Sequence, residues 1–111
     1  METTFAAVGD ANRRAILACL AKSEMSVGEL EALLKMTQPS VSKHLRVLRD
    51  AGFVEARIAA QRRLYRIRAQ PFQEMDVWLA QFRRYWAAQV DALGRHLEKM
   101  EREPRGKGKR R

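Results

Sequence analysis

The sequence predicts a mainly α-helical fold with one small β-hairpin. Three observations support this prediction. Two helical segments with marked ends are separated by only two residues, a short segment after them alternates apolar and basic residues, and a long apolar stripe at helical spacing follows. The 111 residues are enough for one compact domain with its own core. We expect this domain to span residues 1–103 and the basic tail at 104–111 to be disordered.

The first third of the chain predicts three helices. Apolar residues recur at helical spacing over 5–22, but Gly9-Asp10 interrupts them, which indicates a short helix and then a second helix capped near Asp10. Ser26 and Glu29 have the spacing of a capping box, which predicts a third helix over 26–35. We expect the apolar stripe of this helix to consist of Val27, Leu30, Leu33 and Leu34.

A fourth helix has both ends marked. Thr37 is a capping residue, Pro39 suits the first turn, and Gly52 suits the position after the last turn. Only Lys35 and Met36 separate this helix from the third, so the two helices must cross at a steep angle. The sequence therefore predicts a helix-turn-helix.

Residues 53–58 and 64–68 predict two short strands joined by a loop at 59–63. The loop contains no Asn-Gly or Gly-rich pair, so its conformation stays open. A hairpin directly after a helix-turn-helix forms a wing. The predicted fold is thus a winged helix-turn-helix with about five helices and a two-stranded wing.

From Pro71 to about Met100 the pattern predicts one long helix, because apolar residues recur every three or four positions. At 1.5 Å per residue such a helix is about 45 Å long, more than so small a domain can cover. We therefore expect a homodimer formed through the terminal helices. The predicted interface consists of Phe5, Leu79, Phe82, Trp86, Val90, Leu93 and Leu97.

Positive charge is concentrated in two segments of a chain whose net charge is +9. Residues 35–68 hold nine basic and two acidic residues, and 104–111 hold five basic residues and no acidic one. This distribution indicates a polyanionic partner. The single cysteine excludes an intrachain disulfide, and the N-terminus has no signal-peptide or membrane-span pattern. We expect a cytoplasmic protein without a membrane partner.

The fourth helix is the expected contact to double-stranded DNA. With Val41, Leu45 and Leu48 directed inward, its other face is polar and basic, and such a helix fits the major groove. The predicted contacts on the helix are Gln38, Ser40, Ser42, Lys43, His44 and Arg46. For His44 two interpretations stay open: it contacts a phosphate, or it packs beside the wing.

The hairpin supplies the remaining predicted contacts. Arg62 and Arg63 at its tip are expected to reach the adjacent minor groove, where arginine is favoured by the narrow, negative surface. Arg57 is expected to lie nearer the phosphate backbone.

Two segments resemble the ArsR family of bacterial winged-helix regulators. One runs from Gln38 through Pro-Ser-Val-Ser-Lys-His-Leu-Arg to Val54, and the other is Asp10-Ala-Asn-Arg-Arg-Ala-Ile-Leu17. The resemblance implies a dimer with an antiparallel wing, whose N- and C-terminal helices form the interface. It also implies binding to a pseudo-palindromic operator and, as a rule, repression.

The chain differs from the metal-sensing members of that family. Ser26 and Gly28 stand where those members have metal-binding thiolates, and the C-terminal helix contains His96 without an Asp-x-His pattern. We therefore expect no metal site and no cofactor. The sequence also shows no Ser/His/Asp or Cys/His set and no Gly-rich phosphate loop, so we do not expect an enzyme.

The predicted function is a sequence-specific dimeric repressor that does not sense metal and that can regulate its own promoter. Two alternatives stay open. One is a non-specific nucleic-acid-binding structural protein, for which the basic tail would count. The other is a family sensor of a small molecule or of a thiol-reactive signal, the latter through Cys19.

Overall fold

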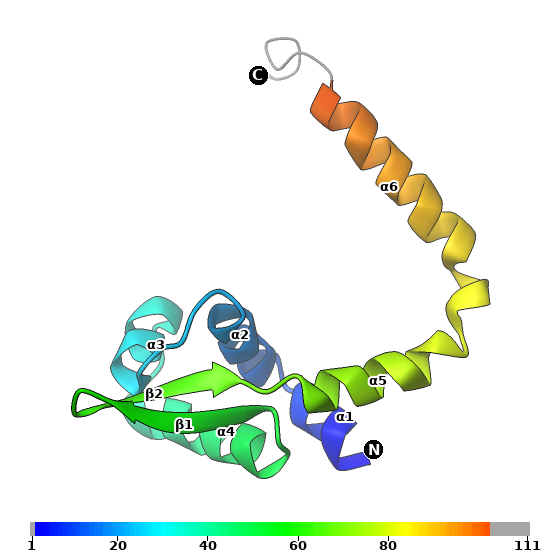
Figure 1. Cartoon of the computed structure of the whole chain (residues 1–111). Helices are drawn as coiled ribbons and strands as arrows, with labels where there is room; N and C mark the ends of the chain where they lie inside the picture. Colours follow the sequence, from blue (N-terminus) through cyan, green and yellow to red (C-terminus); the bar gives the residue numbers. More distant parts are fainter. Residues whose placement is uncertain (1, 103–111) are drawn as a thin grey trace. The chain divides into compact units, whose positions relative to one another are not determined.

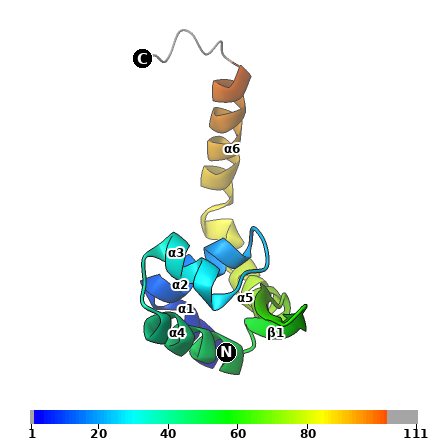
Figure 2. The ribbon, with the colours of Figure 1, turned by 90° about the vertical axis from the view of Figure 1, so that its left-hand side faces the viewer.

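The computed structural model describes residues 2–102, which fall into two compact units divided between Val77 and Trp78. Figure 1 shows the elements of the first unit along the chain, and Figure 2 shows its four N-terminal helices gathered together in a second view. These elements are α1 (Glu2–Val8), α2 (Ala11–Leu20), α3 (Val27–Leu34), α4 (Gln38–Asp50), β1 (Val54–Ala59), β2 (Arg62–Ile67) and α5 (Gln70–Ala80), the last of which crosses the division. The predicted tail, 104–111, lies outside the described residues, and the boundary at 103 stays a prediction.

The starts of α2, α3 and α4 are fixed by the predicted capping residues. The Asp10 carboxylate accepts a hydrogen bond from the Asn12 backbone N–H at 2.8 Å. Ser26 and Glu29 form the reciprocal capping box, with distances of 3.2 and 2.8 Å. The Thr37 hydroxyl accepts a hydrogen bond from the Ser40 backbone N–H at the start of α4, at 3.4 Å. The predicted helix starts are therefore confirmed, because each side chain pairs a backbone donor that the helix leaves unpaired.

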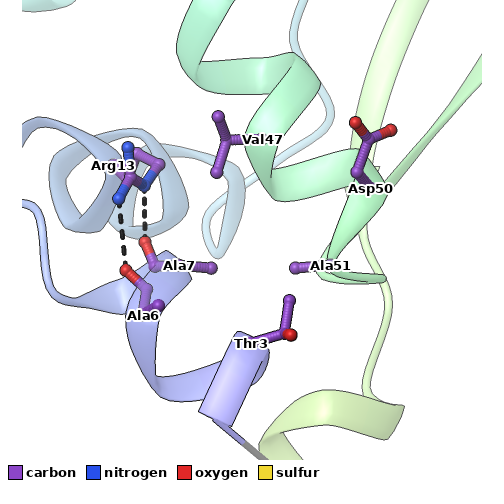
Figure 3. A pocket seen from close by; sticks show the side chains of 7 residues that line it. All are labelled: Thr3, Ala6, Ala7, Arg13, Val47, Asp50 and Ala51. Carbon is purple, nitrogen blue, oxygen red and sulfur yellow. Dashed lines mark hydrogen bonds between the residues drawn. The ribbon is translucent and has the colours of Figure 1, made fainter.

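Two arginines of α2 hold the end of α1. Arg13 donates from Nε to the Ala7 carbonyl at 2.6 Å and from Nη2 to the Ala6 carbonyl at 3.2 Å (Figure 3). Arg14 donates to the Val8 carbonyl at 2.8 Å. Cations are favoured beside the last carbonyls of a helix, so this arrangement holds α1 against α2. A hollow of about 250 Å³ remains beside Arg13 between α1 and α4.

The core lies between the helices and the hairpin. Its fully buried large side chains are Ile16, Leu30, Val41, Leu45, Leu48, Phe53 and Val54. Phe72 of α5 packs edge-on against Phe53 with ring centroids 5.0 Å apart. The inward face predicted for α4 is thus confirmed, but Leu33 of α3 is 60% exposed and does not belong to the apolar stripe. The reason is that α3 is covered on one side only, by α2, α4 and β2.

The hairpin differs from the prediction in its turn. The strands are antiparallel and pair up to Ala59 and Arg62, so the turn consists of Ala60 and Gln61 and the predicted five-residue loop is wrong. Both turn residues have positive φ, 51° and 72°. Two consecutive positive φ values are the requirement of a type I′ turn, which usually selects Asn-Gly. The absence of that pair is why the sequence did not reveal the short turn.

The strained turn leads to a stability prediction. The double variant Ala60→Asn/Gln61→Gly should raise the free energy of unfolding by about 1 kcal/mol, because Asn and Gly adopt positive φ at lower cost than Ala and Gln. Urea denaturation would measure this change. Ala60→Val is the matched control and should lower stability, because a β-branched residue tolerates positive φ poorly. Lower stability of the Asn-Gly variant would contradict the type I′ assignment.

A short backbone bridge attaches the free edge of β2 to the segment before α3. The Met25 N–H donates to the Tyr65 carbonyl at 3.1 Å, and the Tyr65 N–H donates to the Met25 carbonyl at 2.8 Å. Tyr65 is itself buried. The wing is therefore held to the rest of the first unit along one edge.

The second unit corrects the prediction of one long helix. The chain leaves the α-helical form after Ala80, forms a 3₁₀ turn at Arg83–Tyr85, and continues as α6 (Ala87–Arg102). Around the break the Phe82 N–H bonds to the Leu79 carbonyl at 2.9 Å, while the Gln81 side chain donates to the Trp78 carbonyl at 3.0 Å. The Gln81 amide thus satisfies a carbonyl that an uninterrupted helix would have paired with the Phe82 N–H.

Aromatic side chains pack on one another at this break. The Phe82 ring lies 4.8 Å from the Trp78 ring and 6.5 Å from the Tyr85 ring, measured between centroids. Such contacts are local to the second unit and favour the compact turn. No proline or glycine occurs at this break, so the apolar periodicity alone predicts a continuous helix.

Candidate nucleic-acid interface

The exposed face of α4 carries the basic side chains predicted to contact DNA. Burial of Val41, Leu45 and Leu48 fixes the rotation of the helix. Lys43 and Arg46 consequently lie on the exposed side, and no ion pair is recorded for either within residues 2–102. Their positive charges are available to a ligand outside the chain.

The N-terminal part of α4 adds hydrogen-bonding groups. Gln38 is exposed, and its amide donates to the Ser42 hydroxyl at 2.9 Å. Ser40 and Ser42 are half-buried. Gln38 and Ser42 therefore present one connected polar pair next to the positively polarised helix start, where a phosphate is favoured.

His44 lies on a different side of α4 from Lys43 and Arg46. It is half-buried, and its Nδ1 atom is buried without a hydrogen-bond partner among the described residues. The backbone N–H of Arg13 chiefly lowers the pKa of Asp10, and the charge of His44 contributes to the same lowering. This effect places His44 near Asp10 at the start of α2, and both sequence interpretations of His44 stay predictions.

Two wing arginines, Arg57 and Arg62, are held by carboxylates from outside the hairpin. Arg57 donates from Nε to Glu24 Oε1 at 2.8 Å, and its Nη2 lies 2.7 Å from the same oxygen. Arg62 Nη2 lies 2.9 Å from Glu29 Oε1. Arg63, by contrast, has no recorded carboxylate partner in the part of the chain that the structure describes.

Arg62 and Arg63 lie at the turn end of the hairpin, but within a strand and not in the loop. They are the first two residues of β2, and they pair with Ala59 and Ile58 of β1. The prediction that these arginines belong to the loop is wrong because the turn is only two residues long. Both remain exposed and adjacent to the turn.

A second set of ion pairs continues across the wing. Arg66 Nε lies 2.7 Å from Glu55 Oε2, and Arg66 Nη1 lies 3.7 Å from Glu24 Oε2. Arg68 lies 3.9 Å from Glu55. The hydrogen bond from Arg57 lowers the pKa of Glu24, and Glu55 raises the pKa of Arg66. Glu24 therefore stays ionised near neutral pH.

The sequence does not reveal that Glu24 and Glu29 contact the wing arginines. Each contacts an arginine 33 positions away in the chain, so no local spacing could pair them. Glu29 was identified only as a helix-capping residue. The one available signal was that the chain before residue 35 has more acidic than basic residues while the next segment is strongly basic.

The residues predicted for the dimer interface belong to both units. Phe5 is half-buried in α1 of the first unit. In the second unit Phe82 and Trp86 are half-buried, and Leu79 is exposed. Along α6, Val90, Leu93 and Leu97 form an apolar row whose members are between 49% and 57% exposed. This row has no covering element within the second unit as described.

Two further sequence expectations concern metals and membranes. No group of three or more His, Cys, Asp or Glu side chains comes together among residues 2–102, and the expectation that the protein does not sense metal stays a prediction. Cys19 is half-buried against the core. None of the described helices combines the length and apolar character needed to cross a membrane.

Comparison with known proteins identifies related sequences. Residues 10–56 match the family described as "Bacterial regulatory protein, arsR family". The chain is 53% identical over 55 residues to the biofilm growth-associated repressor of Agrobacterium fabrum, a segment that covers 49% of this chain and 47% of that protein. The chain thus spans about half the length of the curated relatives it matches first.

Solved structures extend the likeness over most of the chain. The ArsR family transcriptional regulator RHA00566 is 31% identical, with a TM-score of 0.67, and the match covers 78% of this chain and 89% of that one. The homodimeric winged helix-turn-helix DNA-binding domain of Mb0332 from Mycobacterium bovis is 25% identical, with a TM-score of 0.61 and coverage of 78% and 82%. The predicted fold is confirmed, and the chain is a winged helix-turn-helix protein of the ArsR family.

Proposed function

We propose that this protein is a sequence-specific DNA-binding transcription regulator. The observation that carries the proposal is the face of α4, where Lys43 and Arg46 are exposed beside the polar pair of Gln38 and Ser42. A helix with such a face fits the major groove, and lysine and arginine there can hydrogen-bond guanine edges. Family membership supports the same conclusion.

The regulator acts as a homodimer on a pseudo-palindromic operator. The exposed row of Val90, Leu93 and Leu97 on α6 supports dimerisation, because a second copy can cover it. One solved relative is described as homodimeric. Two symmetry-related α4 helices then read two half-sites of opposite direction.

Repression is the expected outcome of binding, and the protein's own promoter is one expected target. A small dimer can repress by occupying a promoter, and one curated relative is named a repressor. We further propose that the regulator works in the cytoplasm without a metal, since Ser26 and Gly28 stand where metal-sensing members of the family have thiolates.

Binding of the metal-free protein to its own upstream DNA and to a scrambled duplex tests the proposal. Fluorescence anisotropy at several salt concentrations should show a preference of about 10³ or more for the native DNA. Equal affinity for both duplexes with the same steep salt slope would refute sequence-specific regulation. That outcome would favour non-specific binding through the phosphate backbone.

A further inference from the structure

Most of the wing arginines have a carboxylate partner in the structure, so fewer positive charges are available to DNA than the sequence suggests. Four wing arginines lie within 3.9 Å of a carboxylate, and two of the carboxylates come from the segment before α4. These four are Arg57, Arg62 and Arg66 of the strands and Arg68, the residue directly after β2. Arg63 is the wing arginine without such a partner among residues 2–102.

We propose that Glu24 and Glu29 determine specificity by restraining the wing. They hold Arg57 and Arg62 against the body of the first unit, which lowers the wing's attraction for phosphate of any sequence and leaves Arg63 as its main phosphate contact. This inference rests on the proposed DNA-binding function. It assigns to two acidic residues an effect on DNA discrimination that they exert without touching DNA.

The Glu24 carboxylate is well placed to hold Arg57. Both Nε and Nη2 of Arg57 reach Glu24 Oε1, at 2.8 and 2.7 Å, and Arg66 approaches the other oxygen at 3.7 Å. The next residue, Met25, is joined to β2 by two backbone hydrogen bonds. Because the backbone on both sides of the ion pair is ordered by other contacts, little additional freedom is lost when the pair forms.

The Glu29 carboxylate is held in place by the helix that it caps. Its Oε1 atom accepts from the Ser26 N–H at 2.8 Å and from Arg62 at 2.9 Å. The Ser26 N–H is the main cause of the lowered pKa of Glu29, and Arg62 adds to the lowering. The carboxylate is therefore charged and oriented toward Arg62 by the start of α3 itself.

Neutralising these arginines changes non-specific binding more than specific binding. Affinity for DNA of any sequence depends on how many phosphates the protein neutralises, whereas recognition of bases depends on α4. A regulator must find its site among a large excess of other DNA, so the ratio of the two affinities matters. Carboxylates that withhold two arginines from phosphate raise this ratio.

The test measures binding of a scrambled duplex by the full-length variants Glu24→Gln and Glu29→Gln. Glutamine keeps the side-chain shape and can complete a capping box, so α3 should keep its cap. Each variant should steepen the slope of log affinity against log salt by about 0.9, the contribution of one released arginine. Glu74→Gln on α5 is the charge-matched control, and it should leave the slope nearly unchanged. No ion pair is recorded for Glu74 in the described chain.

Arginine variants show whether a steeper slope comes from the release of one arginine or only from the higher net positive charge of the variant. Arg63→Ala should reduce the wild-type slope by about 0.9, and Arg57→Ala should change it little. In the Arg57→Ala background, Glu24→Gln should then behave like the control. The inference is overturned if Glu24→Gln and Glu29→Gln behave like Glu74→Gln, or if Arg57→Ala lowers the slope as much as Arg63→Ala.

Heparin chromatography distinguishes failure of this inference from failure of the proposed function. Heparin is a polyanion without base sequence, so later elution of Glu24→Gln and Glu29→Gln than of Glu74→Gln supports restrained arginines even if no operator exists. Equal elution of all three variants overturns the inference even if wild type prefers its own upstream DNA. Damage to the fold would weaken binding, whereas the expected result is a gain.

Discussion

The variant Lys43→Ala/Arg46→Ala should lose the preference for native DNA by a factor on the order of a hundred or more. Each base contact from such a residue contributes about 1–3 kcal/mol of discrimination, and both side chains lie on the exposed face of α4. Their removal should leave the core intact, because the helix is held by its buried face. Anisotropy with native and scrambled duplexes would measure the loss, and thermal unfolding would check the fold.

A charge-matched control distinguishes recognition of the native DNA sequence from electrostatic attraction to DNA of any sequence. Arg95→Ala/Lys99→Ala removes two positive charges from exposed positions of α6. This variant should keep the preference for native DNA, although its affinity for both duplexes falls slightly. If both double variants lose the preference equally, α4 does not read the bases and the assignment of the interface is wrong.

The variant Leu93→Glu/Leu97→Glu should convert the dimer to a folded monomer. Covering a leucine side chain contributes about 1.5–3 kcal/mol, so loss of two in each copy weakens association by at least a hundredfold. Because the two leucines are 57% and 49% exposed within the described chain, the substitutions should leave its helices intact. Light scattering would give the mass, and circular dichroism would give the helix content.

The opposite face of α6 provides the control for this experiment. Ala88→Glu/Arg95→Glu places two glutamates on the side of the helix away from the apolar row, and this variant should remain dimeric. The monomer should also lose most of its affinity for native DNA, because each copy then reads only one half-site. A dimer that survives Leu93→Glu/Leu97→Glu would exclude the α6 row as the interface.

The helix starts and the winged fold could be predicted because their causes are local. Asp10, Ser26 and Thr37 each cap a helix through a backbone N–H at most three positions away. Burial of Val41, Leu45 and Leu48 follows directly from their helical spacing. The exposed positions of Lys43 and Arg46 were predictable for the same reason.

The predictions of two local features, the C-terminal helix and the hairpin turn, were wrong because other interactions prevailed over the sequence pattern. The apolar stripe predicted one long C-terminal helix, but the bond from Gln81 to the Trp78 carbonyl and the packing of Phe82 on Trp78 accompany a break. The missing Asn-Gly pair concealed a two-residue turn, because Ala60 and Gln61 adopt positive φ despite their side chains. Strand pairing on both sides overrides the preference of these two residues.

By itself the sequence determined the order of the elements, the inward face of α4 and the family, since these depend on spacing and on neighbouring residues. Only the tertiary structure decided which basic residues remain available to DNA. Arg57 and Arg62 contribute to the basic segment in the sequence, yet the fold brings Glu24 and Glu29 against them from 33 positions away. Electrostatic attraction acts through space over a few ångströms, so only the folded chain shows which opposite charges meet.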